Sequence, residues 1–145
     1  MQERFETFTV LINRISRNIR KIKNQEMAEY GLRSAHVSCL YYLYSAEGIT
    51  ATELCERCEE DKATISRALD YLEKNGYLSS DGKRYKKALM LTEKGVEAGR
   101  KIAGKIDGVL EMISGDLSNE ERLAFYRSLS IISNSLDAVL KRGEK

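Results

Sequence analysis

The absence of proline is the feature that most constrains the fold of this chain. None of its 145 residues is proline, although about 5% is ordinary usage and proline is the residue that most strongly interrupts helices. Long helices are therefore permitted almost anywhere. With 42% hydrophobic and 32% charged residues, the composition predicts one compact, mainly α domain, and not a disordered tail, a fibre or a membrane span.

The N-terminal segment has the apolar periodicity of a helix that packs against another helix. Apolar residues recur at alternating steps of three and four from Phe5 to Ile22, and the opposite face carries basic residues. A 3.5-residue repeat that lasts nearly three heptads is typical of a narrow packing seam. We therefore expect a partner helix for residues 1–30.

Two further amphipathic helices are predicted within residues 93–145. The first follows Thr92, and the second begins at a capping box formed by Ser118 and Glu121 and extends to Lys141. The first contains glycines, each costing about 1 kcal/mol relative to alanine in a helix interior; they are Gly95, Gly99, Gly104 and Gly108. Either this helix is weak or another backbone passes close to it. The terminal helices predict a homodimerisation scaffold, with a monomeric bundle as the alternative.

Residues 31–92 have a different pattern, with two short helices joined by a tight turn. The first runs from Thr52 to about Cys58, and Asp61 caps the second, which ends at Gly76. This spacing predicts a helix-turn-helix. The sequence Asp81-Gly82 between two extended segments then predicts a small β-hairpin, so that the region forms a winged helix.

The second helix of this motif offers side chains suited to reading DNA. A recognition helix needs an apolar inward face and polar residues on the outward face of its N-terminal half. Arginine is the residue best suited to a bidentate contact with guanine, so Arg67 is the best candidate for base readout. The alternative is an ordinary solvated helix face. The outward positions are Lys62, Thr64, Ser66 and Arg67.

The predicted hairpin carries a dense basic cluster, for which contact with a polyanion is the favoured interpretation and a solubilising loop the alternative. Residues 62–94 contain eight basic and four acidic residues, a local charge of +4, whereas the whole chain carries only +2. Positive charge is therefore concentrated around the recognition elements. The basic residues of the hairpin are Lys83, Arg84, Lys86 and Lys87.

These segments resemble a known family. The run ATELCERCEEDKATISRALDYLEKNGYLSS, the basic wing and ALMLTEKG are similar to the winged-helix core of the MarR family of bacterial transcriptional regulators. The resemblance implies a homodimer, recognition helices in successive major grooves, wings near the minor grooves and often a small ligand that weakens DNA binding. It supports the four recognition-helix residues and Arg84. The family's wing often carries Asp-x-Arg at positions that are Lys83 and Tyr85 here.

The cysteines and the single histidine give weaker signals. Cys55-x-x-Cys58 has the spacing of a redox or zinc motif, but we favour packing as small apolar residues. The peroxide-sensing branch of the family uses a cysteine in the N-terminal helical region, where this chain has none before Cys39. His36 lies in a tyrosine-rich segment where, by resemblance, effectors can lodge. A pocket for a small aromatic ligand formed by Tyr30, His36 and Tyr41 is therefore a hypothesis, and core packing is its alternative.

The sequence thus predicts a cytoplasmic, homodimeric, sequence-specific transcriptional regulator. We expect a repressor that binds a pseudo-palindromic operator in double-stranded DNA without a cofactor. The N-terminus lacks the pattern of a secretory signal, and no segment is apolar enough to span a membrane. An enzyme is disfavoured by the lone histidine and the absence of a glycine-rich phosphate loop. A winged helix that binds another protein is the main alternative.

Overall fold

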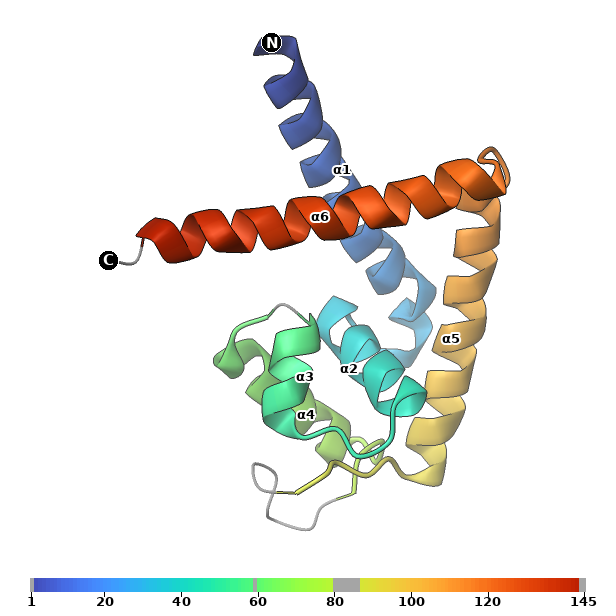
Figure 1. Cartoon of the computed structure of the whole chain (residues 1–145). Coiled ribbons are helices and arrows are strands. Elements are labelled where there is room, and N and C mark those ends of the chain that lie inside the picture. Colours follow the sequence, from blue (N-terminus) through green and yellow to red (C-terminus); the bar gives the residue numbers. More distant parts are fainter. Residues whose placement is uncertain (1, 59, 80–86, 144–145) are drawn as a thin grey trace. The chain divides into compact units, whose positions relative to one another are not determined.

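The computed structural model describes residues 2–58, 60–79 and 87–143, with described side chains beginning at Thr7. It is mainly α-helical (Figure 1). Two compact units divide within the fifth α-helix, Met1–Lys105 and Ile106–Lys145. The elements are α1 (Gln2–Glu26), a 3₁₀ turn η1 (Ala28–Tyr30), α2 (Ser34–Ser45), α3 (Ala51–Cys58), α4 (Lys62–Lys74), α5 (Glu93–Ser114) and α6 (Asn119–Gly143).

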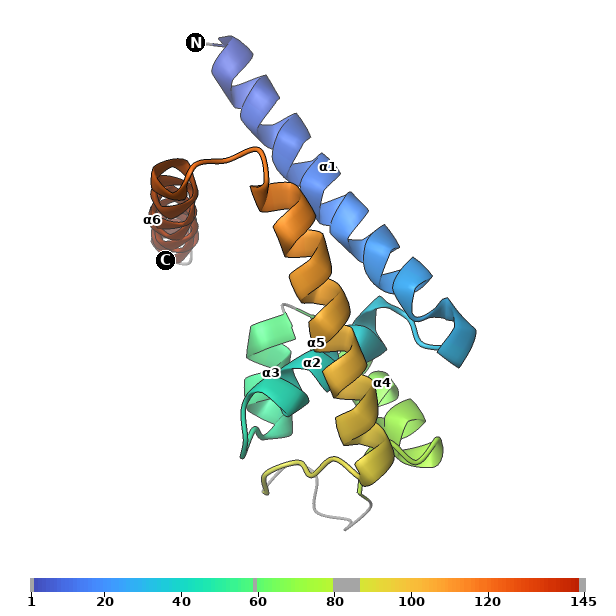
Figure 2. The same cartoon turned by 90° about the vertical axis from the view of Figure 1, so that its right-hand side faces the viewer.

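The core of the first unit lies among α2, α3 and α4, which pack against one another, while α1 packs against α2. Figure 2 shows α1 leading through η1 into α2. Burying one large aliphatic side chain stabilises the fold by about 1.5–3 kcal/mol relative to leaving it exposed. The largest contributions come from fully buried residues on these three helices: Leu40, Leu54, Ile65, Leu69 and Leu72.

Both ends of α4 are fixed by the local signals that the sequence contains. At the start, the Asp61 carboxylate accepts a hydrogen bond of 2.6 Å from the backbone N–H of Thr64. At the end, Gly76 adopts a left-handed conformation (φ +80°), and the N–H of Tyr77 donates to the carbonyl of Leu72 at 2.8 Å. This is a Schellman arrangement, which satisfies carbonyls that a helix end leaves without partners. The predicted boundaries of this helix are confirmed.

The first half of α5 lies close to the rest of its unit at two glycines. A Cβ atom on Gly95 would stand 2.1 Å from the Tyr77 carbonyl oxygen, and one on Gly99 would stand 2.5 Å from the Cβ atom of Tyr44. Another backbone therefore passes close to α5 at Gly95, as one of the two alternatives predicted, whereas the close neighbour of Gly99 is a side chain. A Cβ atom on Gly104 or Gly108 would meet no described neighbour within 4 Å apart from its own helix. Close packing therefore does not explain these two glycines within the described part of the chain.

The β-hairpin of the predicted wing is not confirmed. Across residues 2–58, 60–79 and 87–143 no strand is assigned, and the segments that flank the predicted turn are joined by an isolated antiparallel bridge between Leu78 and Leu91. Next to it, the N–H of Ser79 donates to the carbonyl of Met90 at 2.9 Å. The Asp81-Gly82 turn lies outside the described residues. Antiparallel pairing thus exists at the base of the predicted hairpin.

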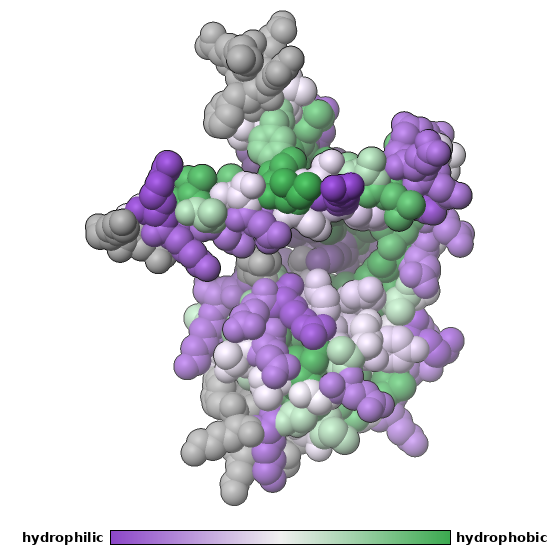
Figure 3. Space-filling model, in the orientation of Figure 1, coloured by the Kyte–Doolittle hydropathy of each residue, from purple (hydrophilic) through white to green (hydrophobic). Residues whose placement is uncertain are grey.

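The second unit contains the end of α5 and the whole of α6. The capping box is formed in both directions: the N–H of Glu121 donates to Ser118 Oγ at 3.1 Å, and the N–H of Ser118 donates to Glu121 Oε1 at 3.2 Å. No residue of α6 is buried, and apolar side chains are visible along it (Figure 3). No helix among the described residues combines the length and apolar character that crossing a bilayer requires.

Candidate nucleic-acid interface

The four candidate residues of the recognition helix lie together on the first two turns of α4. Lys62 and Arg67 are exposed, and Thr64 and Ser66 are partly buried. The opposite side of the helix is in the core, where Ile65, Ala68, Leu69 and Leu72 are buried. One face of α4 therefore anchors the helix while the other presents two cations and two hydroxyl groups at its N-terminal end, the arrangement that DNA readout requires.

Arg67 is connected to the N-terminal cap of α4. Its Nη2 lies 3.4 Å from Thr64 Oγ1, and Thr64 also contacts the capping carboxylate of Asp61. Hydrogen bonds from the backbone and side chain of Thr64 lower the pKa of Asp61, with a smaller effect of the Arg67 charge. This chain of contacts biases the guanidinium toward the N-terminal end of the helix, the part of a recognition helix that meets base edges.

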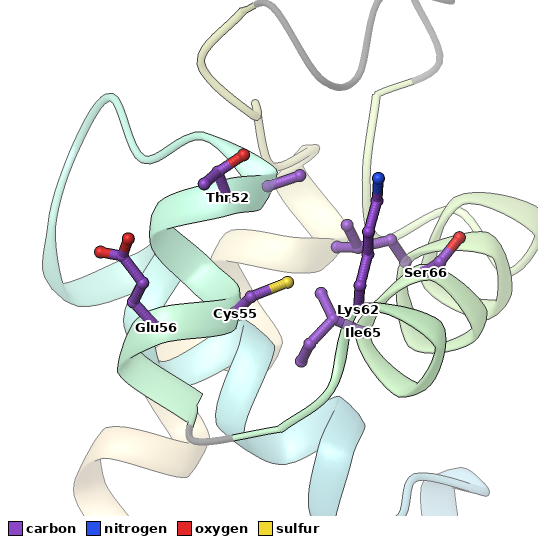
Figure 4. A pocket seen from close by; sticks show the side chains of 8 residues that line it. Thr52, Cys55, Glu56, Lys62, Ile65 and Ser66 are labelled. Carbon is purple, nitrogen blue, oxygen red and sulfur yellow. The ribbon is translucent and has the colours of Figure 1, made fainter. Parts of the chain in front are cut away.

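A groove between α3 and α4 adjoins this face (Figure 4). Its volume is about 430 Å³, with Ile65 and Leu69 among its apolar lining. Lys62 and Ser66 line it from α4, while Cys55 points toward it from α3. Sequence reasoning placed Cys55 as a core residue, but the structure places it half-buried in this wall. Sequence reasoning also missed Thr52 and Glu56, which line the groove; the only signal for them is that Thr52 lies one helical turn before Cys55 and Glu56.

The wing contributes one described cation. Lys87 is exposed and lies two residues before Leu89, whose N–H donates to the carbonyl of Ile49 at 2.8 Å. The other three candidates, Lys83, Arg84 and Lys86, lie outside the described residues. The base of the wing is therefore tied to the segment between α2 and α3, and the roles of the basic cluster stay a prediction.

The three residues proposed for an effector pocket have different neighbours. Tyr30 is half-exposed, with the Lys101 ammonium 5.3 Å from its ring centroid. His36 stacks on Tyr71 of α4, with ring centroids 4.3 Å apart, and Tyr41 meets Tyr42 edge-on at 5.3 Å. Each aromatic ring has a packing partner of its own, and the effector role stays a prediction.

His36 also has a structural role at the start of α2. Its Nδ1 accepts a hydrogen bond of 3.0 Å from the backbone N–H of Arg33. Burial, and secondarily the charge of Arg33, lowers the pKa of His36. An imidazole whose Nδ1 accepts a hydrogen bond is the neutral form, so the hydrogen bond and the lowered pKa agree.

Comparison with known proteins finds a similarity to one family. A family model described as "MarR family" matches residues 30–84, which include α2, α3 and α4. The chain is also 28% identical over 117 residues to the uncharacterized HTH-type transcriptional regulator YwoH of Bacillus subtilis (strain 168). This match covers 79% of this chain and 85% of that protein. The chain is therefore similar to the MarR family of transcriptional regulators.

Solved MarR-type structures extend the likeness beyond residues 30–84. The Staphylococcus aureus MepR-DNA complex matches with a TM-score of 0.78 and 20% identity, over 89% of this chain and 97% of that one. NMB1585, a MarR family regulator from Neisseria meningitidis, matches with a TM-score of 0.82 and 16% identity, over 97% and 99%. The MarR fold therefore includes the helices on both sides of the winged helix-turn-helix.

Proposed function

We propose that this protein is a MarR family regulator, a homodimeric repressor that binds a pseudo-palindromic DNA operator through α4. The observation that carries the proposal is the outward face of α4, where Lys62, Ser66 and Arg67 stand opposite a fully anchored apolar face. An exposed arginine on the N-terminal half of such a helix fits a bidentate contact with guanine, while lysine and serine fit phosphates or base edges.

The wing is proposed to hold the duplex backbone. Lys87 is exposed beside the antiparallel base of the predicted hairpin, and the local charge of residues 62–94 is +4. Lysine contacts to phosphate add affinity without sequence information, because they release counterions from any sequence. MepR, whose complex with DNA is among the similar structures, supports DNA as the partner.

A second copy of the chain is proposed to cover the apolar stripes of the terminal helices. On α1, Ile12, Ile15 and Ile19 are 38%, 47% and 47% exposed. On α6, Leu123 is 69% and Leu140 67% exposed. Contiguous apolar surface of this kind marks an interaction site. In a two-fold dimer, the two recognition helices would match two DNA half-sites about 34–36 Å apart.

Control by a small aromatic ligand completes the proposal. A dimer that must fit two half-sites loses affinity when a ligand favours another separation of its lobes. By linkage, such a ligand binds the free protein more tightly than the DNA complex, by the factor by which it weakens DNA binding. Tyr30, His36 and Tyr41 are the residues whose replacement is expected to change that factor.

The test compares Arg67→Ala with Lys87→Ala on one bound DNA sequence and its single-base variants. Arg67→Ala is expected to reduce discrimination at one base pair by about 1–3 kcal/mol, or roughly five- to 150-fold. Lys87→Ala is expected to weaken binding to all sequences alike and to make the salt dependence shallower by about one unit. Equal loss of discrimination in both variants would refute the assigned roles.

The alternative function, a winged helix that binds a protein partner, predicts a different outcome. In that case the parent protein shows no preference among the duplexes and Arg67→Ala loses no discrimination, because any DNA affinity is nonspecific. Fluorescence anisotropy at two or more salt concentrations distinguishes the two functions, since nonspecific affinity falls steeply with salt for all sequences.

A further inference from the structure

Three lysines of α5 each reach the end of another structural element of the first unit. They follow one another at steps of seven and four residues, which are about two turns and one turn of an α-helix, so their side chains share one face of α5. All three lie within the first compact unit. This face, the lysine stripe, consists of Lys94, Lys101 and Lys105.

The outer two lysines of the stripe donate to main-chain carbonyls at the C-terminal ends of two helices. Lys94 Nζ donates at 2.6 Å to the carbonyl of Asn75, the C-terminal cap of α4. Lys105 Nζ donates at 2.6 Å to the carbonyl of Glu26, the last residue of α1, and lies 3.4 Å from its Oε2. The last carbonyls of a helix lack partners within the helix and form the negative end of its dipole, so a cation suits them as donor.

The middle lysine of the stripe reaches the turn between α1 and α2. Lys101 Nζ lies 3.4 Å from Tyr30 Oη and 5.3 Å from the centroid of the Tyr30 ring. Tyr30 is the last residue of η1. The stripe therefore connects the end of α4, the end of η1 and the end of α1 to one continuous helix.

The end of α4 has further contacts with the first turn of α5. The Thr92 hydroxyl donates to the carbonyl of Gly76 at 2.5 Å and accepts a hydrogen bond of 3.1 Å from the N–H of Gly95. Lys94 Nζ also lies 4.3 Å from the centroid of the Tyr77 ring. Together with the carbonyl that Lys94 binds, these contacts hold three consecutive residues at the end of α4.

We propose that Lys94 is a positioning residue for DNA reading, which fixes the C-terminal end of α4 to α5 and thereby sets the direction in which its N-terminal half meets the duplex. The inference rests on the proposed DNA-binding function of α4. Lys62, Ser66 and Arg67 lie on the first two turns of α4, whereas Lys94 binds the opposite end of the helix. Lys94 therefore acts through the helix and not through contact with bases.

The length of α4 makes its N-terminal half sensitive to the position of its other end. The helix has 13 residues and is therefore about 20 Å long, so a tilt of about 5° around one end displaces the other by about 2 Å. A hydrogen bond to a base edge is lost over a smaller displacement than this. A small movement at Asn75 is thus enough to disturb readout by Arg67.

Two other roles of Lys94 predict different results. If Lys94, which is exposed, bound a DNA phosphate directly, its removal would make the salt dependence of binding shallower by about one unit. If Lys94 only stabilised the fold, its removal would not change the DNA affinity of protein that is still folded. A positioning role predicts weaker binding with an unchanged salt dependence.

The experiment compares Lys94→Met with Arg100→Met in the full chain, at a temperature at which all proteins are folded by circular dichroism. Arg100 is the matched control, because it carries the same charge on the same helix but pairs with Glu97 of that helix at 2.6 Å. The probe is a duplex that the parent protein selects from a random DNA pool. Lys94→Met should bind it on the order of tenfold more weakly, as when one molecule in ten has the competent orientation. Arg100→Met should bind like the parent, and Lys94→Arg, which keeps a charged donor, should retain most of the affinity.

Hydrogen exchange of the free protein tests the contact without DNA. The N–H groups of residues 75–77 donate to carbonyls of the last turns of α4. In Lys94→Met they should exchange about tenfold faster than in the parent, since a hydrogen bond from a charged donor changes an equilibrium by about tenfold or more. The amides of α2 should keep the protection that they have in the parent.

Three results would overturn the proposal: a shallower salt dependence in Lys94→Met, an unchanged DNA affinity, or unchanged exchange at residues 75–77. The proposed function fails in a different way. A parent protein without preference among duplexes would refute DNA reading by α4, and with it the positioning role, while the exchange result would still decide whether Lys94 holds the end of the helix.

Discussion

Replacing Gly95 by alanine tests the packing of the first turn of α5 against the base of the wing. The new Cβ atom would lie 2.1 Å from the Tyr77 carbonyl oxygen and 3.0 Å from Leu91 Cδ2. A backbone oxygen cannot rotate away, and this one also accepts a hydrogen bond of 3.1 Å from the N–H of Thr92. The contact must lengthen by about 1 Å to reach even the tight end of ordinary contacts, 3.0 Å, and α5 must therefore shift from Tyr77.

Two contributions lower the stability of the Gly95→Ala protein and one raises it. Overpacking costs about 1–3 kcal/mol, and weakening the hydrogen bond to Tyr77 costs about 1 kcal/mol. Alanine regains about 1 kcal/mol of helix propensity relative to glycine. Gly95→Ala is therefore expected to lower the free energy of unfolding by about 1–3 kcal/mol.

Gly104→Ala is the matched control on the same helix. No described atom lies within 4 Å of its added Cβ atom, so only the propensity gain of up to about 1 kcal/mol applies. Urea unfolding followed by far-UV circular dichroism, at one protomer concentration for all proteins because a dimer's stability depends on concentration, measures both changes. A Gly95→Ala protein as stable as the Gly104→Ala protein would refute the packing argument.

Three further predictions concern assembly, the Cys58 thiol and pH. Ile15→Asp should convert the dimer to monomer in light scattering, because a buried unpaired carboxylate costs several kcal/mol; a monomeric wild-type protein at micromolar concentration would contradict the dimer. Lys23→Gln should raise the pKa of Cys58 and shift the pH profile of its alkylation upward. The pKa of His36 in the folded protein lies below the usual 6.5. Neutral His36 therefore stabilises the fold above pH 6.5, and this stabilisation is lost as the pH falls toward the folded pKa. The difference in stability between wild type and His36→Gln should accordingly shrink from pH 7.5 to 5.5.

The helix boundaries could be predicted because their signals act over a few residues. Asp61 reaches the N–H of Thr64, and Ser118 and Glu121 satisfy each other's backbone groups. Gly76 supplies the positive φ that ends α4. Each of these hydrogen bonds joins residues within one helical turn. Neighbours in the sequence therefore determine the helix boundary, and the pattern can be recognised without knowledge of the fold.

Contacts between distant segments could not be predicted in this way. Tyr71 Oη donates to the carbonyl of Gly31, forty residues away, at 3.1 Å, and the same Tyr71 stacks on His36. The sequence predicted that Cys55 and Cys58, three residues apart on one helix, both pack as small apolar residues. In the structure the two cysteines instead line two different pockets, Cys58 one that also includes Lys23 and Ser38, and Cys55 the groove beside α4.

The recognition face lies between these two cases. Helical periodicity assigned Ile65, Leu69 and Leu72 to the core, and all three are buried, so the outward position of Arg67 followed from the pattern. The contact of Arg67 with Thr64 depends on rotamers that periodicity does not determine. Its partner bases depend on the DNA, which the protein sequence does not encode.

Selection of bound duplexes from a random DNA pool by the purified protein tests the central claim most directly. A homodimer that reads DNA with two copies of α4 should enrich an inverted repeat whose half-sites are centred about 10–10.5 base pairs apart, or a multiple of that spacing. The selected sequence should lose its preference at one symmetric base pair with the Arg67→Ala protein. A pool that stays random after repeated rounds, or that converges on a single unrepeated site, would contradict the account.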